Sequence, residues 1–469
     1  MKRLLPLLCA AALCGCASHP ERMRPVKAAF ADPAFTALVP DEKPFSESDM
    51  TGRNRILLLQ ERGRALQLLG DARGSASNYL AAADAYDAQD EVPVVSLSES
   101  LGDTAALLAN DLVLPYEGNA HERVMVQQLD AFNRIAMLDW DGVGVDVRRI
   151  VRLSEKERER AEARAAAARE AASENPDYSF AQLSANPVYQ SNFAAARKVA
   201  EAYKDALQNG YAYYFAGYYN ELGGHFSQAA IGYRRATEVA PLNGYAEADL
   251  RRMERALSEG ADPGPGPEET DVAVFFEEGF APELQRFDLR YVIGPISIAF
   301  TQPYYAEADL SLPSSPLFVR EGPSRLLAQT QVVGDFRALA ARAFEDRMPY
   351  VLTRSVIRAV LKTTAAAAAN NAARKHGGTG AQILVWLGGL LFTQATEQPD
   401  QRSWLLAPRY GQIARFRVKA GEHDFTLLHG GMERHVQIDA PPGGHVLLHV
   451  MSVPGRLVVE ATGLDFSGH

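Results

Sequence analysis

The chain has 469 residues, of which 47% are hydrophobic, and a formal net charge of −10 at pH 7. This length and apolar content can supply the cores of two or three domains, whereas the excess of acids argues against general binding to nucleic acid. All of its cysteines lie within the first sixteen residues, which excludes disulfides and thiolate metal sites from the remainder.

The first fifteen residues have the pattern of an export signal. Lys2 and Arg3 precede an apolar run over 4–13, which is too short for a transmembrane helix of about 20 residues. The sequence Leu13-Cys14-Gly15-Cys16 follows and resembles a lipobox. We therefore expect cleavage before Cys16 and acylation of its thiol; the alternative is an ordinary secretory signal.

The residues that follow Cys16 predict the membrane in which the lipid is inserted and the nature of the segment that connects it to the first domain. Ala17 and Ser18 follow the cysteine, and no aspartate does, which favours the outer membrane of a Gram-negative cell, with the protein facing the periplasm. The segment 16–50 is rich in proline and polar residues, so it is predicted to be a tether.

Residues 51–258 predict a helical domain resembling tetratricopeptide repeats (TPR), an α-solenoid, in three windows: 59–90, 121–153 and 209–243. In the third, which matches best, small residues including Gly217 and Ala229 allow two helices to approach, and Tyr233 fills the groove between them. Leu138 and Asn220 depart from the repeat pattern. The alternative is a set of generic helical hairpins.

The inner face of such a solenoid suits extended peptides or protein partners. The candidate contact residues there are Tyr213, Tyr214, Tyr218, Tyr219 and Asn220. Their alternative role, which is the commoner one for such tyrosines, is to pack in the solenoid core.

The stretch 259–270 contains Pro263-Gly264-Pro265-Gly266-Pro267 and is predicted to be a linker. Beyond it, residues 271–469 alternate as strands do, which predicts a β-sandwich-like domain with a helical insertion at about 335–396. The chain is thus expected to be α+β and multidomain. Within the insertion, the apolar run 383–392 is either a core helix or an element that meets a membrane or a partner.

Histidines gather towards the C-terminus: His423, His429, His435, His445 and His449. His445 and His449 are four residues apart on a predicted strand, so about 13 Å separates them, too far for both to hold one metal ion. We expect these histidines at the surface or at strand edges, without a metal.

Other candidates for catalysis are weak. Glu277 and Glu278 are adjacent on a predicted strand and would face opposite sides, unlike a glycosidase pair. Ser403 lacks the Gly-x-Ser-x-Gly turn of a hydrolase nucleophile. We expect no catalytic residue and no cofactor.

Several segments, in order along the chain, resemble a poorly characterised family of Gram-negative TPR-containing lipoproteins. Besides the lipobox they are 141–149, 224–241, 276–279, 352–359 and 400–409. The most specific is the last, with Arg402, Ser403, Trp404, Pro408 and Arg409. The resemblance implies an accessory or assembly factor of the cell envelope, and it carries no catalytic residue.

The sequence therefore predicts a membrane-anchored scaffold that binds envelope proteins or extended peptides. Two alternatives stay open. One is a hydrolase acting on envelope polysaccharide or peptidoglycan, and the other is a structural subunit of a surface or secretion assembly.

Overall fold

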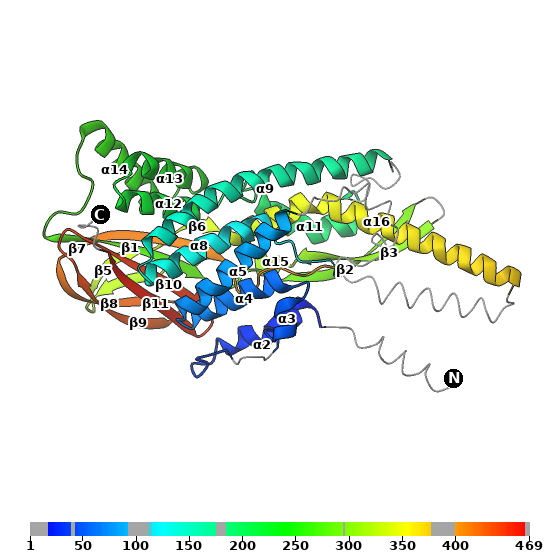
Figure 1. Ribbon diagram of the computed structural model, residues 1–469, viewed down its shortest axis with the longest axis horizontal. Coiled ribbons are helices and arrows are strands. Elements are labelled where there is room, and N and C mark those ends of the chain that lie inside the picture. The colour runs from blue at the N-terminus through cyan, green and yellow to red at the C-terminus, as the bar shows by residue number, and fades with distance from the viewer. Residues whose placement is uncertain are drawn as a thin grey trace.

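The structure is a computed structural model that describes residues 17–38, 43–91, 112, 114–174, 184–293, 296–376 and 399–464. Cys16 and the apolar run 383–392 lie outside the described residues. Helices and strands are both abundant, so the expected α+β class is confirmed. Figure 1 shows the sheets with most strands at one end of an elongated molecule, with α16 extending from the other end.

The helices are α2 (His19–Ala29), α3 (Glu47–Thr51), α4 (Arg55–Leu68), α5 (Ala72–Asp90), α8 (Ala120–Ala136), α9 (Trp140–Glu174), α11 (Pro187–Ala200), α12 (Gly210–Leu222), α13 (Phe226–Val239), α14 (Gly244–Glu259), α15 (Glu307–Leu310) and α16 (Phe336–His376). The strands are β1 (Glu269–Glu278), β2 (Leu284–Ile293), β3 (Ile296–Tyr305), β4 (Phe318–Glu321), β5 (Arg325–Gln329), β6 (Gln331–Asp335), β7 (Tyr410–Lys419), β8 (Gly421–His429), β9 (Met432–Ala440), β10 (His445–Val453) and β11 (Arg456–Leu464).

Three helical hairpins, α4–α5, α8–α9 and α12–α13, share one type of turn. Gly70, Leu138 and Gly224 end their first helices with left-handed φ angles of 81°, 58° and 72°. In each turn the next amide donates to the carbonyl five residues earlier, at 2.9, 2.8 and 2.8 Å. This is the Schellman arrangement, which satisfies carbonyls at a helix end. Each of the three predicted windows therefore contains a hairpin with the same connection.

Glycine is needed where the two helices of a hairpin cross. A Cβ added at Gly63 would lie 2.7 Å from the Tyr79 ring, and one at Gly217 would lie 2.8 Å from the Tyr233 ring. Both glycines stand seven residues before the turn residue, so the same pairing recurs in two hairpins. In the middle hairpin the equivalent residue is Ala131, and a valine replaces the tyrosine opposite it.

Leu138 adopts the conformation that glycine has in the other two turns, and its side chain is 60% exposed. A left-handed conformation costs a residue with a Cβ roughly 1–2 kcal/mol, while glycine loses about 0.5–1 kcal/mol more backbone entropy on folding. Leu138→Gly is therefore expected to raise the free energy of unfolding by about 0.5–1 kcal/mol, as measured by urea denaturation. The reciprocal variant Gly224→Leu should lower it; a destabilised Leu138→Gly variant would contradict the argument.

The strands form two larger sheets and one hairpin. The five-stranded sheet has the order β11-β10-β1-β7-β6, the four-stranded sheet has the order β5-β4-β8-β9, and β2 pairs only with β3 among the described strands. Strand β1 pairs parallel with β10 and antiparallel with β7. The two larger sheets face each other across an apolar cluster that includes Val272, Val274 and Phe276 of β1 and Phe425 and Leu427 of β8.

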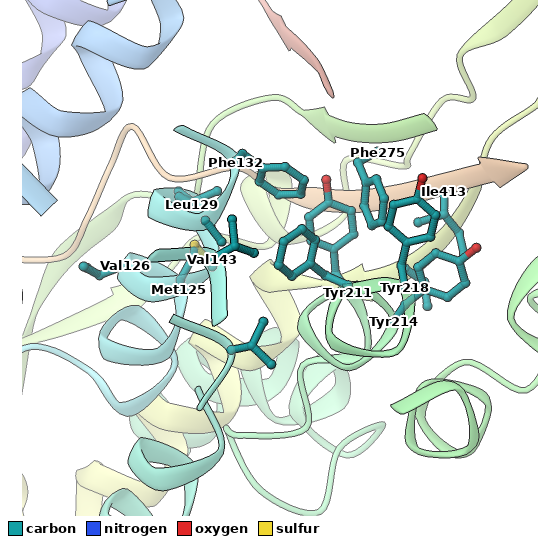
Figure 2. Packing of buried hydrophobic residues seen from close by; sticks show 14 of the residues in the cluster. Met125, Val126, Leu129, Phe132, Val143, Tyr211, Tyr214, Tyr218, Phe275 and Ile413 are labelled. Atoms are coloured by element: carbon teal, nitrogen blue, oxygen red, sulfur yellow. The ribbon is translucent and has the colours of Figure 1, made fainter. Parts of the chain in front are cut away.

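The opposite face of the five-stranded sheet is covered by helices (Figure 1). Phe275 of β1 lies 5.4 Å from Phe132 of α8, and 5.7, 5.7 and 5.6 Å from Tyr211, Tyr214 and Tyr218 of α12, between ring centroids. Figure 2 shows these rings gathered around Phe275. The predicted linker 259–270 thus connects two parts of the chain that share one apolar core.

The hairpins do not leave an open inner face as the solenoid prediction expects. Helix α5 packs on α8, so the first two hairpins lie side by side, whereas the third packs on α14, β6 and β7. Because α8 and α12 bury aromatic residues against β1, the sheet of the same chain covers the face on which a partner was expected.

The predicted tether is folded instead of extended. It contains α2 and α3, and Met23, Phe30 and Phe45 are buried in one cluster with Leu405 and Met451. The tether prediction rested on the polar composition of the segment. Its few apolar side chains nevertheless pack against the rest of the molecule, and their burial stabilises the folded arrangement.

The predicted insertion at about 335–396 contains α16, and its residues 377–398 lie outside the described residues. Helix α16 starts at Phe336 and packs with α11 and β3 around an apolar cluster that includes Phe193, Tyr305, Phe344 and Leu352. Among the helices that the structure describes, none is both long and apolar enough to cross a membrane.

Candidate functional site

The segment 400–409, which carries the family-like motif, lies between the helices and the sheets. The guanidinium of Arg402 donates to Asp400 at 2.8 Å through both Nε and Nη2, and through Nη1 to Asn54 Oδ1 at 3.0 Å and the Leu114 carbonyl at 2.9 Å. Ser403 is buried beside it. Arg402 therefore ties this segment to α4 and to the chain that precedes α8.

Two buried acids from the helices receive the backbone amides that follow. The Trp404 amide donates to Glu122 Oε1 at 2.9 Å, and the Leu405 and Leu406 amides donate to the two oxygens of Glu61 at 2.7 and 2.9 Å. Since a buried amide without a partner is costly, these carboxylates hold the segment in place.

The remaining motif residues continue this connection. The Trp404 ring is buried, and its centroid lies 5.8 Å from that of the Tyr79 ring at an interplanar angle of 67°. Pro408 is buried, and the Arg409 amide donates to the Glu278 carbonyl at 2.9 Å. All five motif residues thus belong to one structural segment that joins α4, α5 and α8 to β1.

A buried charged cluster lies where α4 meets the sheet. Arg64 Nη1 is 2.6 Å from Glu277 Oε2, and His449 bridges Glu277 at 3.1 Å and Glu460 at 3.3 Å. The His449 ring also stacks on Phe132 with 4.1 Å between centroids. Burial by itself would raise the pKa of Glu277, but the charges of Arg64 and His449 outweigh it and hold this pKa below its usual value.

A second cluster joins α12 and α14 to β1 and β7. Arg415 Nη2 lies 2.6 Å from both Glu221 and Asp271, and Arg415 Nη1 lies 3.3 Å from Asp249. Arg252 adds a second cation 2.5 Å from Glu221. Burial would raise the pKa of Glu221, but the two arginines lower it to about 2.

Two of the five candidate partner residues, Tyr214 and Tyr218, belong to this core. The Tyr214 hydroxyl donates to Asp249 Oδ2 at 2.5 Å, and the Arg415 guanidinium lies 5.3 Å from the Tyr218 ring centre. Both side chains are almost completely buried. The prediction that they contact a partner is therefore wrong for this folded state, because β1 and β7 occupy that position.

The other three candidates lie at the edge of the same helix and are partly buried. The Tyr213 hydroxyl donates to the Leu207 carbonyl at 3.0 Å, and the Asn220 amide donates to a carbonyl one turn earlier at 2.7 Å. A Cβ at Gly144 of α9 would lie 2.5 Å from the Tyr219 hydroxyl, so this tyrosine packs closely on α9. These contacts use the side chains within the chain.

The C-terminal histidines are more enclosed than predicted. His429 and His449 are buried, because they point into the space between packed layers, and His445 is largely covered and lies 3.3 Å from Asp271. His423 pairs with an acid at 2.6 Å, and His435 is exposed between two acids. Among the described residues, no group of three or more histidine, cysteine or acidic side chains is placed to hold a metal ion.

A third polar cluster lies between α8 and α9 and was not predicted from the sequence. Arg134 lies 3.1 Å from Asp130 and 2.7 Å from Asp146. Burial raises the pKa of Asp130 to about 6 and that of Asp146 to about 7, in spite of the shared arginine. The available signal was the spacing of Asp130 and Arg134 by one helical turn.

Asp146 should make stability fall with rising pH. Its pKa is higher in the folded than in the unfolded chain, so the folded chain binds more protons between about pH 4 and 7, and this stabilisation is lost as pH rises through about 7. Asp146→Asn is expected to raise the free energy of unfolding at pH 8 by on the order of 1–2 kcal/mol, with little change at pH 4, as measured by urea denaturation.

Asp139 provides a matched control in the same cluster. Its side chain is 43% exposed, and hydrogen bonds from the Gly142 amide and from Arg134 hold its pKa below its usual value. Asp139→Asn should therefore lower the free energy of unfolding slightly at neutral pH. Equal effects of the two substitutions at pH 8 would contradict the assignment.

A cavity of about 540 Å³ opens between the start of α2, the start of β2 and the residues around Gln401. Its lining includes Glu21, Arg24, Glu283 and Arg286, together with the edge of Arg402. None of these residues except Arg402 stood out in the sequence, because α2 and β2 are brought together only by folding.

No protein-family model, no curated protein and no solved structure matches this chain. The clusters described above join separate elements into one body, and the cavity beside α2 presents charged side chains to solvent.

Proposed function

We propose that the protein is a lipid-anchored scaffold or accessory factor of the bacterial cell envelope, attached through Cys16 to the outer membrane and facing the periplasm. The observation that carries this proposal is the recurrence of one hairpin geometry, with matching turns at Gly70, Leu138 and Gly224, in a chain whose residues 13–16 resemble a lipobox. Hairpins of this kind are the units of TPR-like protein-binding solenoids.

The folding of α2 onto the body supports a short attachment. Ser18, two residues after Cys16, forms a capping box with Glu21 at the start of α2, and Met23 is buried. An acyl group on Cys16 would therefore hold the whole body at the membrane surface. Two residues of chain span at most about 7 Å.

The surface offered to a partner is the outer side of the hairpins, since the sheet covers the inner side. Large apolar side chains are exposed on all three second helices: Leu80 of α5, Val145 and Val151 of α9, and Ile231 of α13. Burying such residues at a protein interface is favourable. We propose that the partners are envelope proteins, because the proposed anchor holds the chain in the envelope.

The closed charged clusters favour a structural over a hydrolytic role. Glu277 and His449 lie 3.1 Å apart in the five-stranded sheet, and both are almost completely buried. Glu277 forms an ion pair with Arg64, and His449 forms one with Glu460, both of the same chain.

Co-purification from detergent-solubilised membranes, followed by mass spectrometry, tests the proposal. The wild-type chain should recover a specific envelope protein, and the mass of the N-terminal peptide should show an acylated Cys16. Ile231→Glu should lose this partner, whereas Leu326→Glu, at an exposed apolar position on β5, should retain it. Recovery of no specific partner, together with hydrolysis of cell-wall material, would overturn the scaffold function.

A further inference from the structure

The cavity beside α2 has the size of a ligand site. Its volume of about 540 Å³ falls within the roughly 300–1,000 Å³ of small-molecule sites. Its walls come from the first turn of α2, the first residues of β2 and the segment that ends at Arg402. Arg402 is committed to Asp400 and Asn54, so it forms a fixed wall.

Acidic and basic side chains both line the cavity, and some of them have partners within the chain. Arg24 pairs with Glu283 at 3.2 Å, and Glu21 accepts hydrogen bonds from the Ser18 amide and hydroxyl at 2.8 and 3.0 Å. Arg286 makes no ion pair among the described residues and is exposed. A neutral ligand that carries one anionic and one cationic group matches this set better than a simple anion.

The position of the cavity points to the source of such a ligand. Ser18 is one of its lining residues, and it lies two residues after Cys16, at most about 7 Å of chain away. The headgroup layer on one side of a bilayer is roughly 5–7 Å thick. If Cys16 is acylated, the mouth of the cavity is held among lipid headgroups.

We propose that this cavity binds the zwitterionic headgroup of a membrane phospholipid, its phosphate diester contacting Arg286 and Arg24 and its amine contacting Glu21 and Glu283. Arginine suits phosphate because its planar fork donates two parallel hydrogen bonds. The first turn of α2 adds the positive end of a helix dipole. The membrane source of the lipid rests on the anchor proposed above, whereas the chemistry of the cavity does not.

The test is isothermal titration of the mature, acylated chain in nonionic detergent and phosphate-free buffer. Dihexanoyl phosphatidylethanolamine is expected to bind one molecule per chain, and Arg286→Ala should weaken this binding about tenfold or more. Arg290→Ala is the matched control, because Arg290 is exposed on the same strand outside the cavity, and it should leave the affinity unchanged.

Three results would overturn the assignment. They are an affinity for inorganic phosphate or dihexanoyl phosphatidylglycerol equal to that for phosphatidylethanolamine, equal binding of dihexanoylglycerol, and binding that Arg286→Ala leaves unchanged. Acylation of Cys16 is measured in a separate experiment, by the mass of the N-terminal peptide. A chain that is acylated but does not bind the headgroup contradicts the cavity assignment alone, and an unacylated chain that binds it supports the cavity assignment and contradicts the anchor.

Discussion

Arg415→Ala is expected to lower the free energy of unfolding by about 3–5 kcal/mol, because it leaves buried carboxylates without their cation. Arg415 is 7% exposed in its side chain and lies within 3.3 Å of Glu221, Asp249 and Asp271. Arg252 can compensate only the first two, since it pairs with Glu221 and Asp249. Urea denaturation at pH 7 measures the loss.

The neighbouring Arg417 makes this prediction specific. It lies two residues further along β7, with its side chain 41% exposed, and pairs with Glu269 at 3.4 Å. Exposed pairs of this kind contribute about 0–1 kcal/mol, so Arg417→Ala should change stability little. Lowering the pH towards 2 should narrow the difference between wild type and Arg415→Ala, because Glu221, whose pKa is about 2, then loses its charge. Equal losses for both alanine variants would contradict a role for the cluster in joining α12 and α14 to the sheet.

Glu61→Ala is expected to lower the free energy of unfolding by about 3 kcal/mol or more, since it removes the acceptor of several buried donors at about 1–3 kcal/mol each. Glu61 accepts the amides of Leu405 and Leu406 and lies 2.9 Å from His19 Nε2. The loss should be visible in urea denaturation. It should also loosen α2, so that trypsin cleaves after Arg22 and Lys27, both in α2, faster than in wild type.

Glu254→Ala is the control for this substitution. Glu254 is 48% exposed in its side chain and pairs with an arginine on the surface of the third hairpin, so its removal should cost little and should leave the cleavage of α2 unchanged. Faster cleavage in Glu254→Ala, or wild-type cleavage in Glu61→Ala, would show that Glu61 does not hold α2 to the body.

Both substitutions act on contacts between elements that are far apart in the chain. Arg415 joins the third hairpin to the sheet, and Glu61 joins the first hairpin to α2 and to the segment 400–409. The motif on which the family resemblance mainly rests therefore has a physical role as the connection between helices and strands. Its Trp404 and Arg402 are buried inside the molecule.

The sequence by itself determined the local features of this protein. Gly63 and Tyr79, and likewise Gly217 and Tyr233, mark the crossing points of two hairpins, because only a residue without a Cβ fits beneath the ring. The apolar run at 272–276 predicted a strand, and β1 contains it; side chains of a strand point to opposite faces in turn. Such patterns depend on neighbours within one or two turns, so they can be read without the fold.

Only the tertiary structure decided what covers each surface. Periodicity shows that α8 and α12 have apolar faces, but it does not show that β1 fills them through Phe275. In the same way the composition of 16–50 predicted a tether, and its docking depends on a few side chains such as Met23 meeting Leu405. Pairs such as Arg64 and Glu277 form between positions far apart in the chain, because burial and distance, which no local pattern contains, determine which charges meet.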